Sequence, residues 1–280
     1  MEGFEVTKIG KHIFCILDAG NSSFYMVEGD EKAAVIDTGI TTGKKIMPLL
    51  RELTDKPLLL VATHVHWDHI YHMDEFEEVY MCHDEKKIDE TTLHTLTAGR
   101  LKPWDEIHDI HTDSVISLGG TELRICQVPG HTPGSIVILE TRENYLFTGD
   151  AIGSGCGVWM QIPGSTDLKT YYDSLIHLMH WLIDNGGRMK FFGGHHMQAF
   201  ESVAHPVYNP LGLGVLADMI DWWVRYFPVK SRDVQAMFQE YSPRNHYFML
   251  RMDAQKCSIF FHRNREHSFR CSIRKNNDFI

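Results

Sequence analysis

The strongest constraint on this chain lies between residues 58 and 69, where an apolar run ends in a cluster of histidines and an acid. The run LLLVA is short and continuous, which is typical of a strand buried on both faces. It is followed by THVHWDH, which carries His64, His66, Asp68 and His69. In an extended chain, side chains two positions apart point the same way, so His64 and His66 can converge on one metal ion. A turn into a helix would direct Asp68 and His69 to a second point, and zinc, iron and manganese all accept these ligand types.

Three later strand ends carry the same kinds of residue. VPGHTPGS places His131 on a loop rich in proline and glycine, LFTGD ends a strand with Asp150, and FFGGHH ends another with His195 and His196. The flanking glycines let backbone and metal approach closely. Because functional groups gather on the strand-end loops of layered α/β folds, these residues are expected to join the first cluster.

The pattern of apolar and turn residues predicts two similar halves. In the first half we expect strands over residues 4–9, 12–17, 23–29, 33–39, 58–63 and 79–82, with helices over 44–53 and 84–96. In the second half we expect two strands joined at Gly119-Gly120, strands over 135–140, 144–150 and 189–194, and a helix over 168–183. This order predicts an α/β fold with two sheets packed face to face and helices outside.

Composition narrows the partners. With 27 basic and 37 acidic residues the net charge is 27 − 37 = −10, which argues against nucleic acid. No apolar run approaches the roughly 20 residues that span a bilayer, so no membrane association is expected. The first twelve residues have no signal-peptide layout, and a cytoplasmic location is the default expectation.

The motifs together resemble the metallo-β-lactamase superfamily over about residues 4 to 197. H-x-H-x-D-H, a downstream histidine, a downstream aspartate and a final histidine are all present, as is the DTG at Asp37 to Gly39 that often precedes the cluster. The resemblance implies an αββα four-layer sandwich. It also implies a catalytic core over residues 1–197, which leaves a C-terminal extension over 198–280. In that extension the apolar pattern of the sequence itself predicts a helix over 213–227 and strands in the last 40 residues. That extension would complete the sandwich, cover the site or form a homodimer.

The resemblance also implies a ligand set for two divalent metal ions, with zinc expected first and iron or manganese as alternatives. The first ion would be held by His64, His66 and His131, and the second by Asp68, His69 and His195, while Asp150 would bridge both. His195 is preferred over His196 because the last histidine of the family usually follows a glycine directly. One departure stands out, since Tyr71 and His72 occupy positions where the family often has small residues; they either pack in the helix or narrow the site and offer a proton donor.

A pair of divalent ions can share a water molecule and present it as hydroxide. The expected function is therefore hydrolysis of an ester, thioester or lactone in a small anionic or acyl substrate, as in the glyoxalase II-like and lactonase-like branches, with Asp68 also handling a proton. Two alternatives stay open, an iron-dependent oxidoreductase or persulfide dioxygenase, and a non-catalytic metal-containing binding module. Candidate substrate-facing residues are Arg100, Lys102, Trp104 and Trp159.

Overall fold

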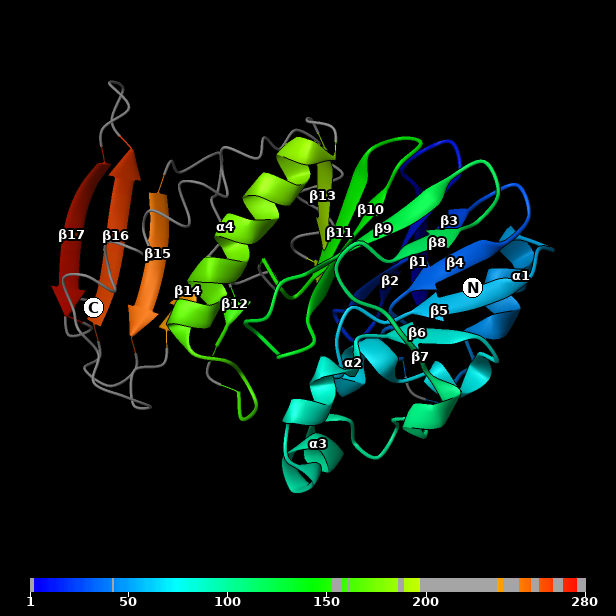
Figure 1. Cartoon of the computed structure of the whole chain (residues 1–280), viewed down its shortest axis with the longest axis horizontal. Coiled ribbons are helices and arrows are strands. Elements are labelled where there is room, and N and C mark those ends of the chain that lie inside the picture. Colours follow the sequence, from blue (N-terminus) through cyan, green and yellow to red (C-terminus); the bar gives the residue numbers. More distant parts are fainter. Residues whose placement is uncertain are drawn as a thin grey trace.

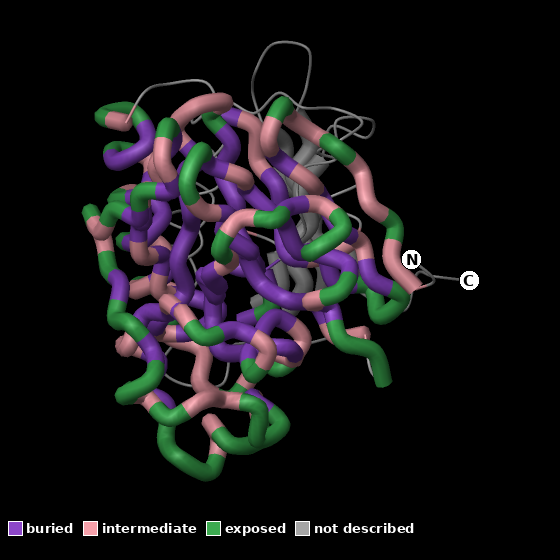
Figure 2. Tube along the Cα trace, turned by 90° about the vertical axis from the view of Figure 1, so that its right-hand side faces the viewer, coloured by how far each residue is buried: buried purple, intermediate pink, exposed green. Residues whose placement is uncertain are grey.

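The computed structural model describes residues 3–41, 43–152, 158–160, 162–185 and 189–196, together with four strands beyond residue 235. Figure 1 shows two sheets lying side by side, one built from the blue and cyan first half of the chain and one from its green second half. This is the four-layer αββα sandwich, in which helical segments cover the outer face of each sheet. In Figure 2 the buried residues follow the strands through the interior, whereas the exposed ones lie in the outer turns.

The first sheet has seven strands in the order of the sequence. Its strands are β1 (Phe4–Lys8), β2 (Ile13–Asp18), β3 (Ser23–Glu28), β4 (Ala33–Ile36), β5 (Leu58–Val61), β6 (Val79–Met81) and β7 (His108–Asp109). Strands β1 to β4 are antiparallel, and β4 to β7 are parallel. Because β5 lies between two parallel neighbours and Leu59 to Val61 are buried, the prediction of a fully covered strand is confirmed.

Short helices cover the outer face of this sheet and connect its strands. They are the α-helices α1 (Met47–Leu53), α2 (Trp67–Ile70) and α3 (Glu90–Leu96) and the 3₁₀ helices η1 (Met73–Glu75), η2 (His83–Lys87) and η3 (Trp104–Glu106). The single helix predicted over 84–96 is wrong, since the chain forms η2 and then α3. Ile88 between them is extended and 5% exposed, and Asp89 starts α3 anew by accepting a hydrogen bond from the Thr92 amide at 3.0 Å.

The second sheet has the strand order β13-β11-β10-β9-β8. Its elements are β8 (Val115–Ser117), β9 (Glu122–Gln127), β10 (Ile136–Glu140), β11 (Tyr145–Gly149) and β13 (Lys190–Gly193), with the helix α4 (Leu168–Asp184). The buried face of α4, including Tyr171, Leu175 and Leu178, packs in one apolar cluster with Leu139 and Leu146 of the sheet. Asp167 caps α4 by accepting a hydrogen bond from the Thr170 amide at 2.8 Å.

Aromatic and branched side chains from both sheets fill the space between them. Tyr25 of β3 has its ring centroid 4.8 Å from that of Phe147 in β11 and 5.8 Å from that of Phe192 in β13. The Tyr25 hydroxyl donates a hydrogen bond of 2.5 Å to the Gly193 carbonyl oxygen at the end of β13. The shared core therefore fixes the strand ends of one sheet against those of the other.

A third sheet links residues near the middle of the chain with its C-terminal part. It contains β12 (Val158–Trp159), β14 (Ala236–Phe238), β15 (Tyr247–Met252), β16 (Cys257–Arg263) and β17 (Phe269–Lys275), in that order and antiparallel throughout. Strands were predicted in the last 40 residues, and β15, β16 and β17 lie there. The helix predicted over 213–227 lies outside the described residues. Within the described part of the chain, no helix is both long and apolar enough to cross a membrane.

Candidate metal centre

All seven residues singled out in the sequence lie together at the ends of strands. Residues 64 and 66 follow β5, α2 carries residues 68 and 69, and the other three follow β9, β11 and β13. Their donor atoms form three overlapping groups, each with all atoms within 4.8 Å of one another: His64, His66 and His131; His64, His69 and Asp150; Asp68, His69 and His195.

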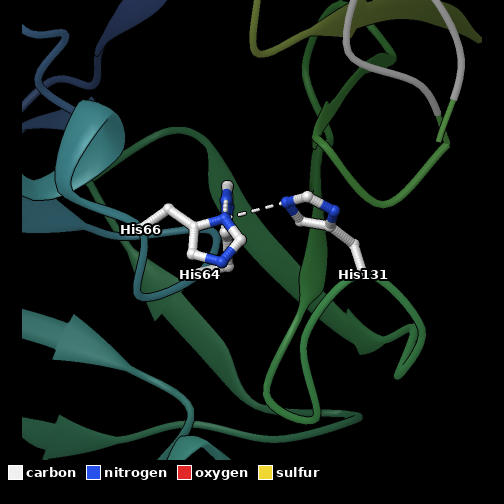
Figure 3. A group of neighbouring side chains, drawn as sticks. All are labelled: His64, His66 and His131. Carbon is white, nitrogen blue, oxygen red and sulfur yellow. Dashed lines mark hydrogen bonds between the residues drawn. The ribbon is translucent and has the colours of Figure 1, made fainter. Parts of the chain in front are cut away.

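Three ring nitrogens converge in the first group (Figure 3). The Nδ1 atom of His66 lies 3.0 Å from Nε2 of His64 and 2.9 Å from Nε2 of His131. Nitrogens that bind one tetrahedral zinc ion at 2.0–2.1 Å are about 3.3 Å apart. The observed spacing is close to that of a formed coordination site.

The neighbours of these rings determine which nitrogens carry hydrogen. Nδ1 of His131 lies 2.7 Å from the carbonyl oxygen of Trp159, which only accepts, so this nitrogen is the donor. Nδ1 of His64 lies 3.1 Å from the hydroxyl oxygen of Thr63, and that hydroxyl already donates to Asp37 at 2.8 Å. The Nε2 atoms of both neutral rings therefore keep free lone pairs. A single hydrogen on Nδ1 of His66 cannot form a hydrogen bond to both of these Nε2 atoms at once. A cation at this point can accept a lone pair from each of the three rings.

The electrostatics of the first group agree with neutral rings. Burial lowers the pKa of His64 and of His66 well below the usual value, and the neighbouring imidazoles lower both further. Burial also lowers the pKa of His131. Unprotonated imidazoles at neutral pH are the form that binds a metal ion.

The other two groups combine histidines with carboxylates. Nε2 of His195 lies 3.6 Å from Oδ2 of Asp68 and 3.3 Å from Oδ2 of Asp150, and Nε2 of His69 lies 3.7 Å from Oδ2 of Asp68. Asp150 also faces the first group, with Oδ2 3.6 Å from Nε2 of His131. The buried atoms His69 Nε2 and Asp150 Oδ1 have no hydrogen-bond partner. With Nδ1 of His69 hydrogen-bonded to Asp37, Nε2 of the neutral ring carries a lone pair, as Asp150 Oδ1 does, and two such buried lone pairs fit a cation between them.

Charge accumulates around His69 and Asp150, where the second and third groups meet. Burial alone lowers the pKa of His69, but the carboxylates of Asp68, Asp150 and Asp37 outweigh it and raise the pKa to about 10. Burial raises the pKa of Asp150, but the charges of His195 and His69 outweigh this effect and bring it below its usual range. This part of the site therefore attracts positive charge, as a proton or as a metal ion.

Asp37 supports the site without being one of the predicted donors. It follows β4 with a φ of 61°, and its Oδ2 lies 2.9 Å from Nδ1 of His69. Its Oδ1 accepts a hydrogen bond from the Thr63 amide at 2.7 Å. A carboxylate on the outer nitrogen of a ligand histidine fixes its tautomer and ring orientation. The DTG motif was noted in the sequence, but this role was not assigned.

The structure distinguishes the two adjacent histidines at the end of β13. The ring of His195 faces Asp68 and Asp150, and its Nδ1 lies 3.1 Å from the Asn21 carbonyl oxygen, while His196 belongs to none of the donor groups of the described residues. The preceding Gly194 is required by close approach, because a Cβ atom there would lie 2.5 Å from Oδ1 of Asp150.

Tyr71 and His72 point to other partners. His72 is buried, with Nδ1 2.8 Å from Oε1 of Glu75 and Nε2 3.1 Å from the Thr41 carbonyl oxygen. Both ring nitrogens of His72 therefore interact with neighbouring protein groups and not with the donor groups. This supports the first of the two expectations for His72, that it packs in the protein interior. The Tyr71 ring stacks against the guanidinium group of Arg100, whose carbon lies 4.0 Å from the ring centroid.

The other candidate substrate-facing residues differ in their surroundings. The Lys102 ammonium donates to the Phe76 carbonyl oxygen at 2.6 Å, and the Trp104 ring lies against that of His83. Trp159 is 51% exposed, and its carbonyl oxygen accepts the hydrogen bond from His131. Trp159 is thus placed beside the first donor group.

Known proteins with similar sequences include an acyl-coenzyme A thioesterase and a probable metallo-hydrolase. Residues 17–180 match the model of the Metallo-beta-lactamase superfamily. The acyl-coenzyme A thioesterase MBLAC2 of Homo sapiens is 28% identical over 234 residues, which is 70% of this chain and 82% of that protein. The probable metallo-hydrolase MJ0888 of Methanocaldococcus jannaschii is 33% identical over 189 residues, which is 62% of this chain and 87% of that protein.

A solved structure confirms the fold. The metallo-beta-lactamase FIM-1 of Pseudomonas aeruginosa, in its mono-zinc form, superposes with a TM-score of 0.56 at 17% identity, covering 78% of this chain and 95% of that one. The relatives support a hydrolase, and the histidine and aspartate groups fit a metal site. Because the family model matches more than half of the 280 residues of this chain, the chain belongs to the metallo-beta-lactamase superfamily.

Proposed function

We propose that this protein is a metal-dependent hydrolase that cleaves a thioester of the acyl-coenzyme A class. The observation that carries the proposal is the convergence of seven donor side chains from separate strand ends at one place. One relative is described as an acyl-coenzyme A thioesterase, and the match covers 82% of that relative's length. This relative favours a thioester over an ester or lactone as the substrate.

Each donor has a proposed role. His64, His66 and His131 would hold one divalent ion, Asp68, His69 and His195 would hold the other, and Asp150 would be shared by both. Zinc is expected first, because it accepts this mixture of nitrogen and carboxylate ligands, with iron and manganese as alternatives. When bound, such a pair of ions supplies an acidified water molecule and polarises the substrate carbonyl group.

Asp68 is the donor placed to handle a proton. Its side chain is 23% exposed, whereas those of His69 and Asp150 are 1% and 6% exposed. It can therefore reach both the centre and an entering substrate. In the proposed reaction, water adds to the carbonyl carbon, the carbon–sulfur bond breaks, and Asp68 passes the proton of the water to the leaving thiolate. The products are a carboxylic acid and a thiol.

The test begins with purified protein reconstituted with zinc, iron or manganese. Elemental analysis is expected to find two equivalents of metal, and acyl-coenzyme A is expected to be cleaved faster than simple esters or lactones. His66→Ala is expected to lower turnover by roughly 100-fold or more, because it removes one ligand of the first group. The matched control is His177→Ala, which changes an exposed histidine on α4 and should leave turnover unchanged.

Other outcomes would contradict the proposal. Loaded protein that binds acyl-coenzyme A without turnover would favour a binding module. Oxygen consumption with a single equivalent of iron would instead favour the oxidoreductase alternative.

A further inference from the structure

Glu85 is a buried acid beside the metal centre that belongs to none of the donor groups. It lies in η2 with 0% of its surface exposed. Its Oε1 atom accepts a hydrogen bond of 3.1 Å from the Val65 amide and one of 2.6 Å from the Thr132 hydroxyl. A single oxygen thus joins two loops that come from different sheets.

Both partners of Glu85 adjoin residues of the first donor group. Val65 lies between His64 and His66 in the sequence, and Thr132 follows His131 directly. The spacing of the three converging nitrogens depends on how these two loops are placed relative to each other. Glu85 accepts hydrogen bonds from both loops, in addition to the backbone bond of 3.0 Å from the Ile136 amide to the Thr63 carbonyl oxygen.

The packing around Glu85 leaves its carboxyl group little freedom. A Cβ atom on Gly134 would lie 2.5 Å from the Cγ atom of Glu85, so the loop backbone presses directly on this side chain. The Thr132 hydroxyl oxygen also lies 2.8 Å from Oγ of Ser135, and that Oγ accepts a hydrogen bond from the Thr132 amide at 3.1 Å. The loop after His131 is therefore held in one conformation against Glu85.

We propose that Glu85 is a positioning residue that sets the distance between His66 and His131 and thereby the affinity of the first metal position. This inference rests on the proposed metal centre, and it adds a residue that neither binds the metal nor touches the substrate. The carboxyl group suits this role because an apolar side chain would leave the buried Val65 amide without an acceptor.

The test measures zinc affinity by competition with a chromophoric chelator. Glu85→Ala is expected to weaken the tighter zinc equivalent by about 10–100-fold, the usual effect of removing a group that orients a ligand. Glu85→Gln keeps an acceptor oxygen and should stay within about threefold of the wild type. Amide hydrogen exchange at Val65 should become faster in Glu85→Ala and not in Glu85→Gln, even in protein without metal.

Glu140→Ala is the matched control for loss of stability. Glu140 is likewise buried, at 1% exposure, and it accepts hydrogen bonds from the Thr121 hydroxyl and from the amides of Arg142 and Glu143. None of these hydrogen bonds reaches a donor loop. This variant should have a lower free energy of unfolding than the wild type, yet it should keep the wild-type zinc affinity.

A second pair of variants decides the question if Glu85→Ala does not fold. Thr132→Val removes the hydroxyl that links Glu85 to the His131 loop, and zinc affinity is expected to fall by about tenfold. Thr132→Ser restores the hydroxyl and should restore the affinity. Equal zinc affinity in Thr132→Val and wild type, or in a folded Glu85→Ala, would overturn the inference. Wild-type protein that binds zinc but cleaves no thioester would overturn the proposed function alone.

Discussion

Glu85 keeps its carboxyl group away from solvent, and this burial raises its pKa from 4.5 to about 7, against the opposing effect of the hydrogen bonds from Thr132 and the backbone. Between these two pH values the unfolded chain has released the proton while the folded protein still holds it. The folded state therefore binds more protons, and its stability falls as the pH rises through this window. Above about pH 7 both states are ionised and the effect stays constant.

This titration predicts a difference between wild type and Glu85→Gln in metal-free protein. From pH 4.5 to 7 the wild type should lose roughly 3 kcal/mol of unfolding free energy relative to the variant, since each unit of pKa difference corresponds to about 1.4 kcal/mol. Urea unfolding at half-unit pH steps measures it. Parallel stability curves for the two proteins would show that Glu85 does not titrate in this range.

The seven donors could be found from the sequence because each is a ligand-type residue placed where a strand ends. Glu85 could not be found in this way. It stands in the charged run DEKK, and nothing local shows that one of these four residues turns inward. Its partner Thr132 is 47 positions away, and the partner of Asp37, His69, is 32 positions away. Such pairs depend on how the sheets pack, which residue patterns along one strand do not record.

At the scale of elements, α4 supports two of the donor loops. The Tyr171 hydroxyl donates to the Ala151 carbonyl oxygen at 2.8 Å, next to Asp150, and the Ser174 hydroxyl donates to the Pro129 carbonyl oxygen at 2.7 Å, near His131. The helix was predicted to within one residue of its observed end, because its apolar stripe and its cap are local features. The boundaries of the helices within residues 84–96 were not predicted, because they depend on Ile88, which packs against the sheet beneath it.

The N-cap of α4 gives a prediction at this scale. Asp167→Ala removes the acceptor for the Thr170 amide and should cost about 1 kcal/mol, which lowers the melting temperature by about 2–4 °C. The control Asp173→Ala breaks only an exposed pair with Lys169 on the same helix, so its effect should stay below about 0.5 kcal/mol. Thermal unfolding of the three proteins makes the comparison. Equal melting temperatures for both variants would argue against the cap.

At the scale of the molecule, every donor group spans the two sheets. Each group takes two donors from residues 64–69, which follow β5 of the first sheet, and one from a strand end of the second sheet. The sandwich itself was predictable, because two similar runs of strands and helices fill both halves of the sequence. The pairing of β12 with β14 was not, because β12 has only two residues. The boundary at residue 197 stays a prediction.

This arrangement predicts that metal stabilises the fold by holding the sheets together. Removing metal with a chelator should lower the melting temperature, and adding zinc should raise it progressively. Free zinc at about 1,000 times its dissociation constant contributes about 4 kcal/mol. Calorimetry over a series of free zinc concentrations measures the effect, with His66→Ala as the variant that should respond weakly. A melting temperature independent of zinc in the wild type would contradict the coupling.

The division of donors between the sheets also limits how a protein of this kind can be shortened or copied. A fragment that stops before β8 would retain four of the seven donors, yet it would complete none of the three groups. A fragment that begins there would retain only three, one from each group. Duplicating either half would therefore reproduce the architecture without its chemistry, which arises only where the unlike halves meet.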